Sequence, residues 1–210
     1  SAVEPGFVIK SELQVAQKQG IAHAAAALVK PGSAIAISAG TTTYQVAREL
    51  RAVPNLTVVT NSMLIAQVLQ EGSDIGQTVI LTGGSRTPSD ALVGPVAVDS
   101  LRGLHVDLLF LGVHGMTARA GLTTPNIVEA ETNRALVASA TRVVVCADHT
   151  KWGVVGLASF GTLADVERVV TDRGLSRAAH EAIEAMGCAV EIACDEESGR
   201  VDGVIPASKA

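Results

Sequence analysis

The sequence predicts an α/β fold, a Rossmann-like and mainly parallel sheet with helices on both of its faces. Short apolar runs alternate with longer segments of helical periodicity along the chain, which is the pattern of βαβ units. The runs Leu108–Leu111 and Val143–Val145 are continuously apolar, as expected for parallel strands that are covered on both faces. Aromatic residues make up only 2% of the 210 residues, so we expect a core of Ala, Val, Leu and Ile.

The first half of the chain is predicted to begin with a helix and to continue as strand–helix units. The helix runs from about Glu12 to Lys30, because apolar residues recur there at helical spacing, and Pro31-Gly32 ends it. Strands are predicted at Ala34–Ser38, Thr57–Thr60 and Thr78–Thr82. A helix is predicted after each of these strands. The first carries Val46, Ala47 and Leu50 on one face, and the second carries Met63, Leu64, Val68 and Leu69. The third extends from about Val93 to Leu104.

The second half repeats this alternation. Strands at Asp107–Leu111 and Arg142–Cys146 flank a helix from Asn126 to about Ala140, where Asn126 and Glu129 have the spacing of a helix cap. A last pair of strands, Val169–Val170 and Val190–Ala193, flanks a helix from Arg177 to Met186. We find no repeat and no linker, so we expect one domain over residues 1–194 and a polar C-terminal tail over residues 195–210.

Charge and composition argue against several classes of function. The formal net charge is −5, from 16 basic and 21 acidic residues, and Lys and Arg are scattered singly. DNA-binding domains usually carry a basic face, so this chain alone is not expected to bind DNA. The longest apolar runs are too short to span a membrane.

Cysteine usage indicates the compartment. The chain has three cysteines, none of them in Cys-x-x-Cys spacing. Their odd number argues against a disulfide framework and favours a reducing, cytoplasmic location. Cys146 lies in an apolar run and is expected to be a buried strand thiol.

The residues that could bind a ligand follow the predicted strands. In open α/β sheets, ligands bind beyond the carboxyl ends of the strands, and four loops meet that condition. The first is Gly40-Thr41-Thr42-Thr43, where glycine lets the backbone approach a ligand. The Thr hydroxyls and the first N–H groups of the next helix can bind a phosphate there. The alternative is a plain strand-to-helix turn with Thr as the N-cap residue.

Two further loops combine glycine with a cationic or polar side chain. Gly83-Gly84 precedes Arg86, which can bind phosphate through two hydrogen bonds or else lies in solvent beside a flexible turn. Gly112 and Gly115 flank His114, which is either a donor to a ligand hydroxyl or phosphate or a structural hydrogen-bonding residue.

The fourth loop carries Asp148 and Lys151. Lys151 can neutralise a phosphate and Asp148 can hold sugar hydroxyls, or the two form a surface ion pair of little energetic value. Asn61 either caps its helix or binds a hydroxyl. The candidate ligand-binding residues are Gly40, Thr41, Thr42, Thr43, Asn61, Gly83, Gly84, Arg86, Gly112, His114, Gly115, Thr124, Asp148 and Lys151.

Patterns typical of catalysis and cofactor binding do not occur in the sequence. It has no Walker loop, no Rossmann Gly-x-Gly-x-x-Gly, no Gly-x-Ser-x-Gly and no His/Cys cluster with metal-ligand spacing. Glu129 and Glu131 could act in acid–base chemistry, but acids at a helix start are common for electrostatic reasons. We therefore expect no catalytic residue, no metal and no cofactor.

Taken in order, the motifs resemble the C-terminal effector-sensing domain of DeoR-family transcriptional regulators over about Gln19 to Leu175. The matching motifs are Ala39–Thr43, Val58–Ser62, Leu81–Gly84 with Arg86, Leu92–Pro95, Phe110–Gly115, Gly121–Thr124, Glu129–Glu131, Ala147–Asp148 with Lys151, and Thr171–Asp172. A single motif is weak evidence, but the ordered series is specific.

The resemblance implies a fold like that of ribose-5-phosphate isomerase and the CoA-transferases, without their catalysis. It implies that residues 1–194 are a ligand-sensing domain for a phosphorylated sugar or a similar anionic metabolite. Such domains form homo-oligomers and act on DNA through an N-terminal winged helix-turn-helix, which we expect to be absent from this chain. The phosphate would lie at Gly40–Thr43, with the other three loops around the sugar.

Two positions depart from the family pattern, and two alternative functions stay open. Ser38 stands where Asp is often found, and Asn133 stands where Lys is often found. One alternative is an active phosphosugar isomerase, but such enzymes carry an Asp-Gly-Ala-Asp-Glu run where this chain has Gly112–Gly115, so candidate proton carriers are replaced. The other is an oligomerisation module that binds no metabolite.

Overall fold

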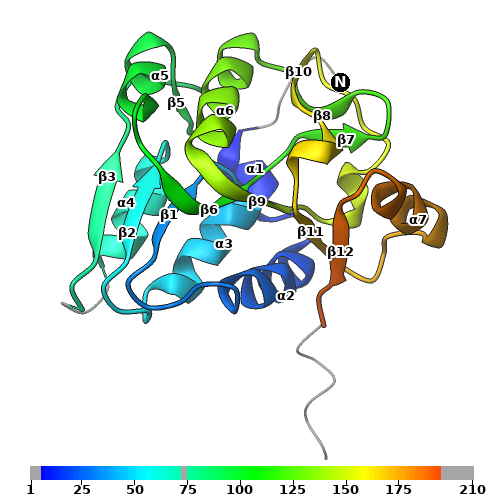
Figure 1. The fold of residues 1–210 in the computed structure, drawn as a ribbon, viewed down its shortest axis with the longest axis horizontal. Coiled ribbons are helices and arrows are strands. Elements are labelled where there is room, and N and C mark those ends of the chain that lie inside the picture. The colour runs from blue at the N-terminus through cyan, green and yellow to red at the C-terminus, as the bar shows by residue number, and fades with distance from the viewer. Residues whose placement is uncertain (1–5, 72–74, 195–210) are drawn as a thin grey trace, which may run out of the picture.

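The structure, a computed structural model, describes residues 6–71 and 75–194 and is built around a seven-stranded sheet. Its strands, in spatial order, are β12 (Ala189–Ile192), β11 (Arg168–Thr171), β9 (Ala140–Cys146), β6 (Val106–Leu111), β1 (Ala34–Ile37), β2 (Thr57–Thr60) and β3 (Thr78–Leu81). All neighbouring strands of this sheet pair in parallel, which confirms the predicted fold class (Figure 1). The predicted C-terminal tail, residues 195–210, lies outside the described residues.

Helices cover both faces of the sheet, as predicted (Figure 1). One face carries α2 (Val15–Ala26), α3 (Thr41–Leu50) and α4 (Met63–Gln70), and the other carries α5 (Pro95–Leu101), α6 (Ile127–Ser139) and α7 (Arg177–Ala185). In β6, Leu108 and Phe110 belong to the first core cluster, whereas Leu109 and Leu111 belong to the second. Successive side chains of a strand point to opposite faces, so the mainly aliphatic core has two layers.

Two predicted helices have wrong boundaries. The helix expected from Glu12 to Lys30 is instead α1 (Phe7–Ser11) followed by α2, and Gln14 between them has a left-handed φ of 53°. The helix expected from Val93 to Leu104 begins only after Gly94, whose φ of 92° turns the chain out of the preceding strand.

Several short strands were not predicted. β7 (Gly115–Thr117), β8 (Gly121–Thr124) and β10 (Ala158–Gly161) form an antiparallel sheet, and β4 (Ser85–Arg86) pairs with β5 (Leu92–Val93) as a hairpin. Gly115 passes so close to Val154 that a Cβ atom would lie 2.2 Å from the Val154 carbonyl oxygen. Packing between these segments therefore requires glycine at position 115.

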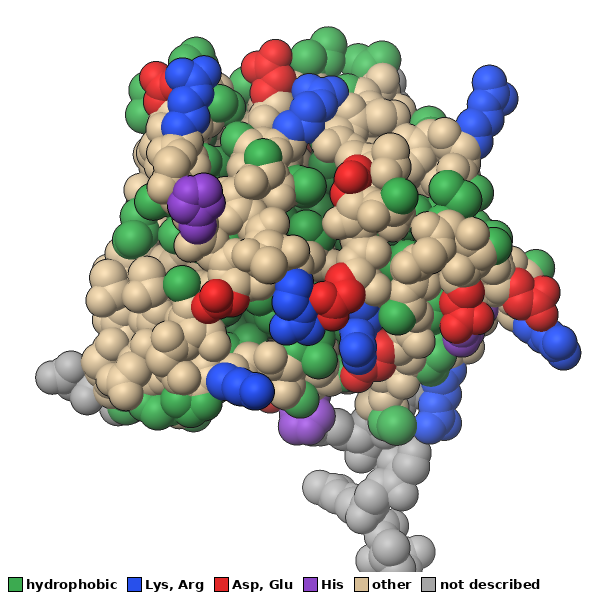
Figure 2. Space-filling model, in the orientation of Figure 1, with side chains coloured by type: hydrophobic (Ala, Val, Ile, Leu, Met, Phe, Trp, Pro, Cys, Tyr) green, Lys and Arg blue, Asp and Glu red, His purple; other side chains and the backbone are tan. Residues whose placement is uncertain are grey.

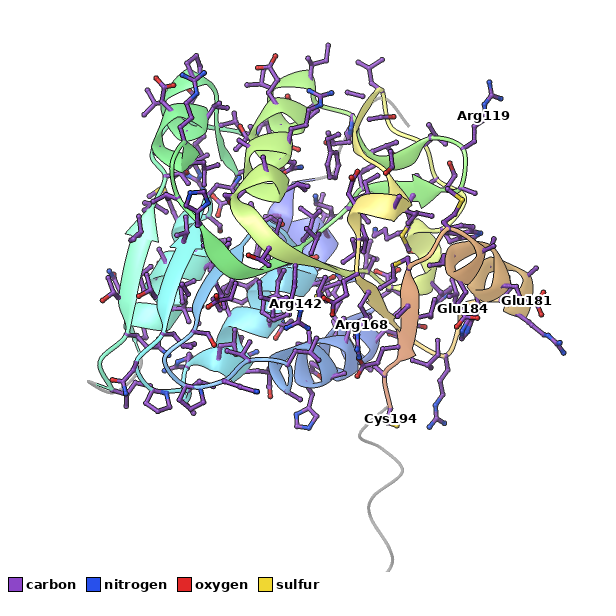
Figure 3. All side chains as sticks on the ribbon, viewed as in Figure 1. Arg119, Arg142, Arg168, Glu181, Glu184 and Cys194 are labelled. Atoms are coloured by element: carbon purple, nitrogen blue, oxygen red, sulfur yellow. The ribbon has the colours of Figure 1, made fainter. Side chains whose placement is uncertain are left out.

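The surface carries charges of both signs. On the face in Figure 2, Lys and Arg side chains lie among Asp and Glu side chains and form no continuous basic area. Arg119 projects away from the body of the protein (Figure 3). Arg142 pairs with Glu167 and Arg168 pairs with Glu191, and partly exposed pairs of this kind contribute little to stability. Within the part of the chain that the structure describes, no helix is long and apolar enough to cross a bilayer.

Candidate functional site

A cleft opens at the carboxyl ends of β1, β2, β6 and β9, the edge at which α/β proteins bind ligands. β1 lies between β2 and β6, so the chain leaves β1 toward one side of the sheet and later returns on its other side. The cleft lies at this switch point and encloses about 750 Å³ outside the protein atoms, its open mouth included. Its lining is Lys10, Ala39, Gly40, Thr41, Thr42, Asn61, Ser89, Ala91, Gly112, Val113, His114, Thr124, Glu129, Asn133, Cys146, Ala147, Lys151 and Phe160.

The loops after β1 and β6 meet closely beside the cleft. The Gly112 N–H donates a hydrogen bond to Ser38 Oγ over 2.9 Å. A Cβ atom on Gly40 would lie 2.9 Å from Thr43 Oγ1 and 3.9 Å from the Gly112 Cα atom. The absence of side chains at the two glycines thus allows the close backbone approach, and Ser38, which departs from the family pattern, joins the two loops.

The Thr-rich loop opens helix α3. Gly40 is the N-cap residue, and no side chain among the described residues caps the helix, so the alternative in which a Thr is the N-cap is wrong. Thr43 is fully buried and its hydroxyl donates to the Ser38 carbonyl oxygen over 2.7 Å. Thr41 and Thr42 line the cleft, and their hydroxyls bond to no other described residue. Two hydroxyls and the first N–H groups of α3 are therefore available to an anion.

Two lysines bring positive charge to this part of the cleft. Lys151 ends the short 3₁₀ helix η1 (His149–Lys151), and Lys10 comes from α1. α1 packs on α3 through Phe7 and Tyr44, whose ring centroids are 5.7 Å apart. The sequence identified Lys151 but gave no signal for Lys10, because the path of α1 back onto α3 depends on tertiary packing.

Buried carboxylates fix η1 in place. Asp148 Oδ1 accepts a hydrogen bond from the Thr150 N–H over 3.0 Å. Asp172, which follows β11, accepts from the His149 N–H over 2.7 Å and from the Gly174 N–H over 3.0 Å, and its Oδ2 lies 2.7 Å from His149 Nδ1. Burial acts to raise the pKa of Asp172, but the hydrogen bonds outweigh it and hold that pKa below its usual value. These contacts position the loop that carries the cleft-lining lysine.

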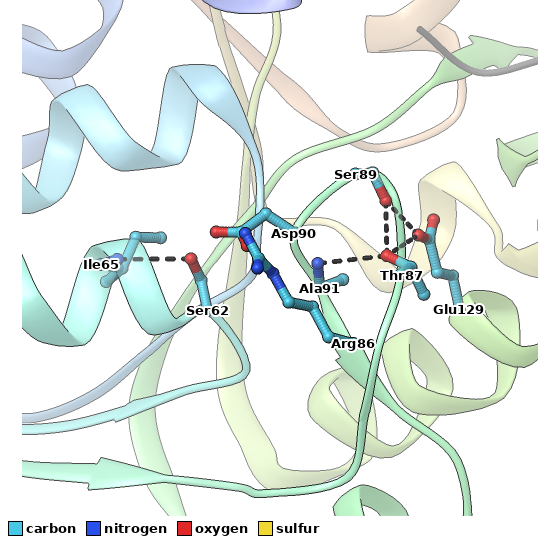
Figure 4. A network of polar contacts seen from close by, with 8 residues as sticks. All are labelled: Ser62, Ile65, Arg86, Thr87, Ser89, Asp90, Ala91 and Glu129. Atoms are coloured by element: carbon cyan, nitrogen blue, oxygen red, sulfur yellow. Dashed lines mark hydrogen bonds and ion pairs between the residues drawn. The ribbon is translucent and has the colours of Figure 1, made fainter. Parts of the chain in front are cut away.

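Another part of the cleft is lined by hydroxyl, amide and carboxylate groups. Glu129 is only 8% exposed, and its Oε1 accepts hydrogen bonds from the hydroxyls of Thr87, over 2.9 Å, and of Ser89 (Figure 4). Its Oε2 accepts from the Thr124 hydroxyl over 3.1 Å. Asn126 caps α6 as predicted, since its side chain accepts from the first-turn N–H groups. Glu129 thus belongs to the cleft and not only to the helix start.

Asn61 joins two segments that border the cleft. Its Oδ1 accepts from the Ala39 N–H over 2.8 Å, and its Nδ2 donates to the Leu92 carbonyl oxygen over 3.2 Å. The N-cap residue of α4 is Ser62, whose side chain accepts from the Ile65 N–H, so the alternative in which Asn61 caps this helix is wrong.

The structure brings together only part of the predicted site. Gly40, Thr41, Thr42, Asn61, Gly112, His114, Thr124 and Lys151 line the cleft, whereas Thr43, Gly83, Gly84, Arg86, Gly115 and Asp148 do not. Arg86 is exposed and its Nε lies 2.5 Å from Asp90 Oδ1. Asp148 lines an adjoining pocket with Lys18. Residues that the sequence did not indicate, such as Ser89 and Phe160, reach the cleft through the short strands described above.

His114 lines the cleft and carries an unpaired polar atom. Its Nε2 is buried and has no hydrogen-bond partner among the described residues. Burial lowers the pKa of His114, and the positive charges of Lys151 and Lys10 lower it further. A buried polar atom without a partner needs an explanation, and a hydrogen bond from a bound ligand would provide one.

We expect His114 to weaken the folded state as the pH falls. A histidine whose pKa is lower in the folded than in the unfolded chain favours unfolding below its ordinary pKa, about 6.5. The His114→Asn variant should therefore lose less free energy of unfolding than the wild type between about pH 7.5 and about pH 5.5, as measured by urea unfolding. His105→Asn, which replaces an exposed histidine, is the control, and equal losses in all three proteins would contradict the expectation.

Comparison with known proteins places the chain among regulators. The family described as DeoR C terminal sensor domain matches residues 13–173. The HTH-type transcriptional regulator GolR of Listeria innocua is 35% identical over 180 residues, which are 85% of this chain and 70% of that protein. The glycerol-3-phosphate regulon repressor of Escherichia coli is 29% identical over 82% of this chain and 68% of its own. Ribose 5-phosphate isomerase A of Methanocaldococcus jannaschii aligns with a TM-score of 0.47 and 18% identity over 64% of this chain and 53% of that chain, a similarity too distant to bear on activity.

Proposed function

The chain belongs to the family of DeoR C-terminal sensor domains, and from this premise we propose that it binds a phosphorylated sugar or a closely related phosphate monoester in the cleft. Its curated relatives are transcriptional regulators and not enzymes. The proposed ligand is therefore an effector, which is bound and released unchanged.

This proposal rests on the different chemical character of two parts of the cleft. One part offers the N–H groups of α3, the hydroxyls of Thr41 and Thr42 and the ammonium group of Lys151, which are suited to a phosphate. Another part offers the carboxylate of Glu129 and the amide of Asn133, which are suited to hydroxyl groups. A molecule that carries both a phosphate and hydroxyl groups satisfies both parts.

The isomerase alternative has less support. Acid–base catalysis requires a side chain that can exchange a proton with the substrate, and such isomerases carry an Asp-Gly-Ala-Asp-Glu run where this chain has Gly112–Gly115. Of the two candidate acidic residues, Glu131 is exposed outside the cleft lining, and Glu129 accepts hydrogen bonds from three protein hydroxyl groups.

Ligand binding becomes regulation only when the ligand favours one of two states of the protein. A relative is named as an HTH-type regulator. We propose that occupancy of this cleft controls a DNA-binding domain of that type within a homo-oligomer, by changing how the subunits are arranged.

A thermal-shift measurement tests the proposed ligand class. Ribose 5-phosphate, glucose 6-phosphate, fructose 6-phosphate and glycerol 3-phosphate are each compared with the unphosphorylated parent compound. A ligand that binds only the folded state at about 100 times its Kd adds about 2.7 kcal/mol to the free energy of unfolding. We expect at least one phosphorylated compound, and none of the parents, to raise the melting temperature. Shifts from the parents alone, or from no compound, would contradict the proposal.

A further inference from the structure

We infer that Glu129 selects the ligand by accepting a hydrogen bond from a neutral hydroxyl group of the ligand. The same carboxylate joins α6 to the β4–β5 hairpin through hydrogen bonds. This inference rests on the proposed function and deepens it, because it specifies the class of effector. The effector is a phosphate monoester with hydroxyl groups, and bisphosphates and sugar acids that place a second anion at Glu129 are rejected.

The hairpin tip is a structured wall of the cleft. The Thr87 N–H donates to the Ala91 carbonyl oxygen over 2.8 Å, and the Ala91 N–H donates back to Thr87 Oγ1 over 3.2 Å. Asp90 has a left-handed φ of 68° and is held by Arg86. Ser89 and Ala91 of this tip line the cleft. The hydrogen bonds from Thr87 and Ser89 to Glu129 therefore fix the wall to α6 (Figure 4).

The acceptor positions of Glu129 are not all occupied. An ionised carboxylate provides about four acceptor positions on its two oxygens. Thr87 and Ser89 use Oε1, and Thr124 uses Oε2. One position on Oε2 remains, and Glu129 lines the cleft, so a ligand hydroxyl can donate to it without displacing any protein group.

The same site disfavours a second anionic group on the ligand. All the hydrogen-bonding partners of the Glu129 side chain among the described residues are neutral hydroxyls, and no described Lys or Arg pairs with it. A ligand carboxylate or phosphate at this point would meet a buried like charge, which is a repulsive means of discrimination. A hydroxyl meets an acceptor that would otherwise lack one partner.

Calorimetric titration of three proteins tests the inference. The wild type, Glu129→Gln and Glu131→Gln are titrated with propyl phosphate, with the four monophosphates named above and with fructose 1,6-bisphosphate. Glu131 lies on the same helix but is exposed and outside the cleft lining, so its variant is the matched control. In the wild type and the control, we expect at least one hydroxyl-bearing monophosphate to bind roughly tenfold to hundredfold more tightly than propyl phosphate. We also expect fructose 1,6-bisphosphate to bind more weakly than fructose 6-phosphate.

In Glu129→Gln, the preference for hydroxyl groups and the rejection of the bisphosphate should both largely disappear, when each affinity is compared with the affinity of the same protein for propyl phosphate. The inference is overturned, and the proposed function is not, if the preference for hydroxyl-bearing monophosphates survives in this variant. The same holds if the wild type binds propyl phosphate but lacks that preference. If no phosphate compound binds the wild type, the proposed function fails and the inference fails with it. Should Glu129→Gln not fold, Glu129→Asp, which withdraws the carboxylate by one methylene, must weaken the same preference, and an undiminished preference there overturns the inference.

Discussion

Replacing Asp172 with Ala is expected to lower the free energy of unfolding by about 3 kcal/mol and to weaken phosphate binding at the cleft. Asp172 is 3% exposed and accepts hydrogen bonds from the backbone N–H groups of His149 and Gly174. Its removal leaves these two part-buried donors without their partner, and this loss costs more than the net value of the bonds. Because the same contacts hold η1, Lys151 should lose its fixed position, and the affinity for propyl phosphate should fall together with stability.

The loss of stability should depend on pH in a defined direction. The pKa of Asp172 is held below its usual value, so its contribution is present above the unfolded pKa, about 3.9, and is lost as the pH falls through the folded pKa. The difference in free energy of unfolding between wild type and variant, measured by urea unfolding, should therefore be large near about pH 7 and small near about pH 3. Asp99→Ala, which breaks an exposed pair with Arg102, should have almost no effect. The expectation would be contradicted if both substitutions had equal effects, or if the difference in free energy of unfolding did not become smaller as the pH falls.

The parallel sheet could be predicted because most of its strands are apolar runs bounded by turns. Val143–Val145 lies within β9, and Cys146 at its end is buried as predicted, with burial raising the pKa of its thiol. The antiparallel strands are only two to four residues long. Such segments as Gly121–Thr124 have a composition equally typical of loops, and tertiary packing decides that they become strands.

The spatial order of the strands in the sheet determines which of the predicted loops share a cleft. No local sequence pattern reveals that order. The carboxyl ends of parallel strands lie at one edge, so all four loops were assigned to the same rim. β3 is the edge strand of the sheet, whereas β9 lies inside the sheet between β11 and β6. Gly83–Arg86 therefore lies outside the cleft lining, while Lys151 reaches it. Ser89 reaches the cleft because the β4–β5 hairpin folds back toward it, and no local sequence pattern indicated this hairpin.

Replacing Lys151 with Met is expected to reduce the affinity for propyl phosphate and inorganic phosphate roughly tenfold to hundredfold. A hydrogen bond to a charged group contributes about 1.5–3 kcal/mol, and each 1.4 kcal/mol is about tenfold in the dissociation constant. Met keeps an unbranched apolar stem, so the packing of η1 should be retained. Calorimetric titration measures the affinity, and Lys30→Met, which replaces an exposed lysine beyond the end of α2, should bind as the wild type does.

The salt dependence of binding separates a direct charge on the ligand from an indirect effect of Lys151 on the loop. Electrostatic attraction in an open cleft is screened by salt, because the Debye length falls from about 10 Å at about 0.1 M to about 3 Å at about 1 M. If the ammonium group meets the phosphate, wild-type affinity should fall with salt and the affinity of Lys151→Met should fall much less. If Lys151 acts only through the loop, both proteins should lose affinity in parallel. An affinity unchanged by the substitution would instead place the phosphate away from the α3 N-terminus and Lys151, and would contradict the proposed orientation of the ligand.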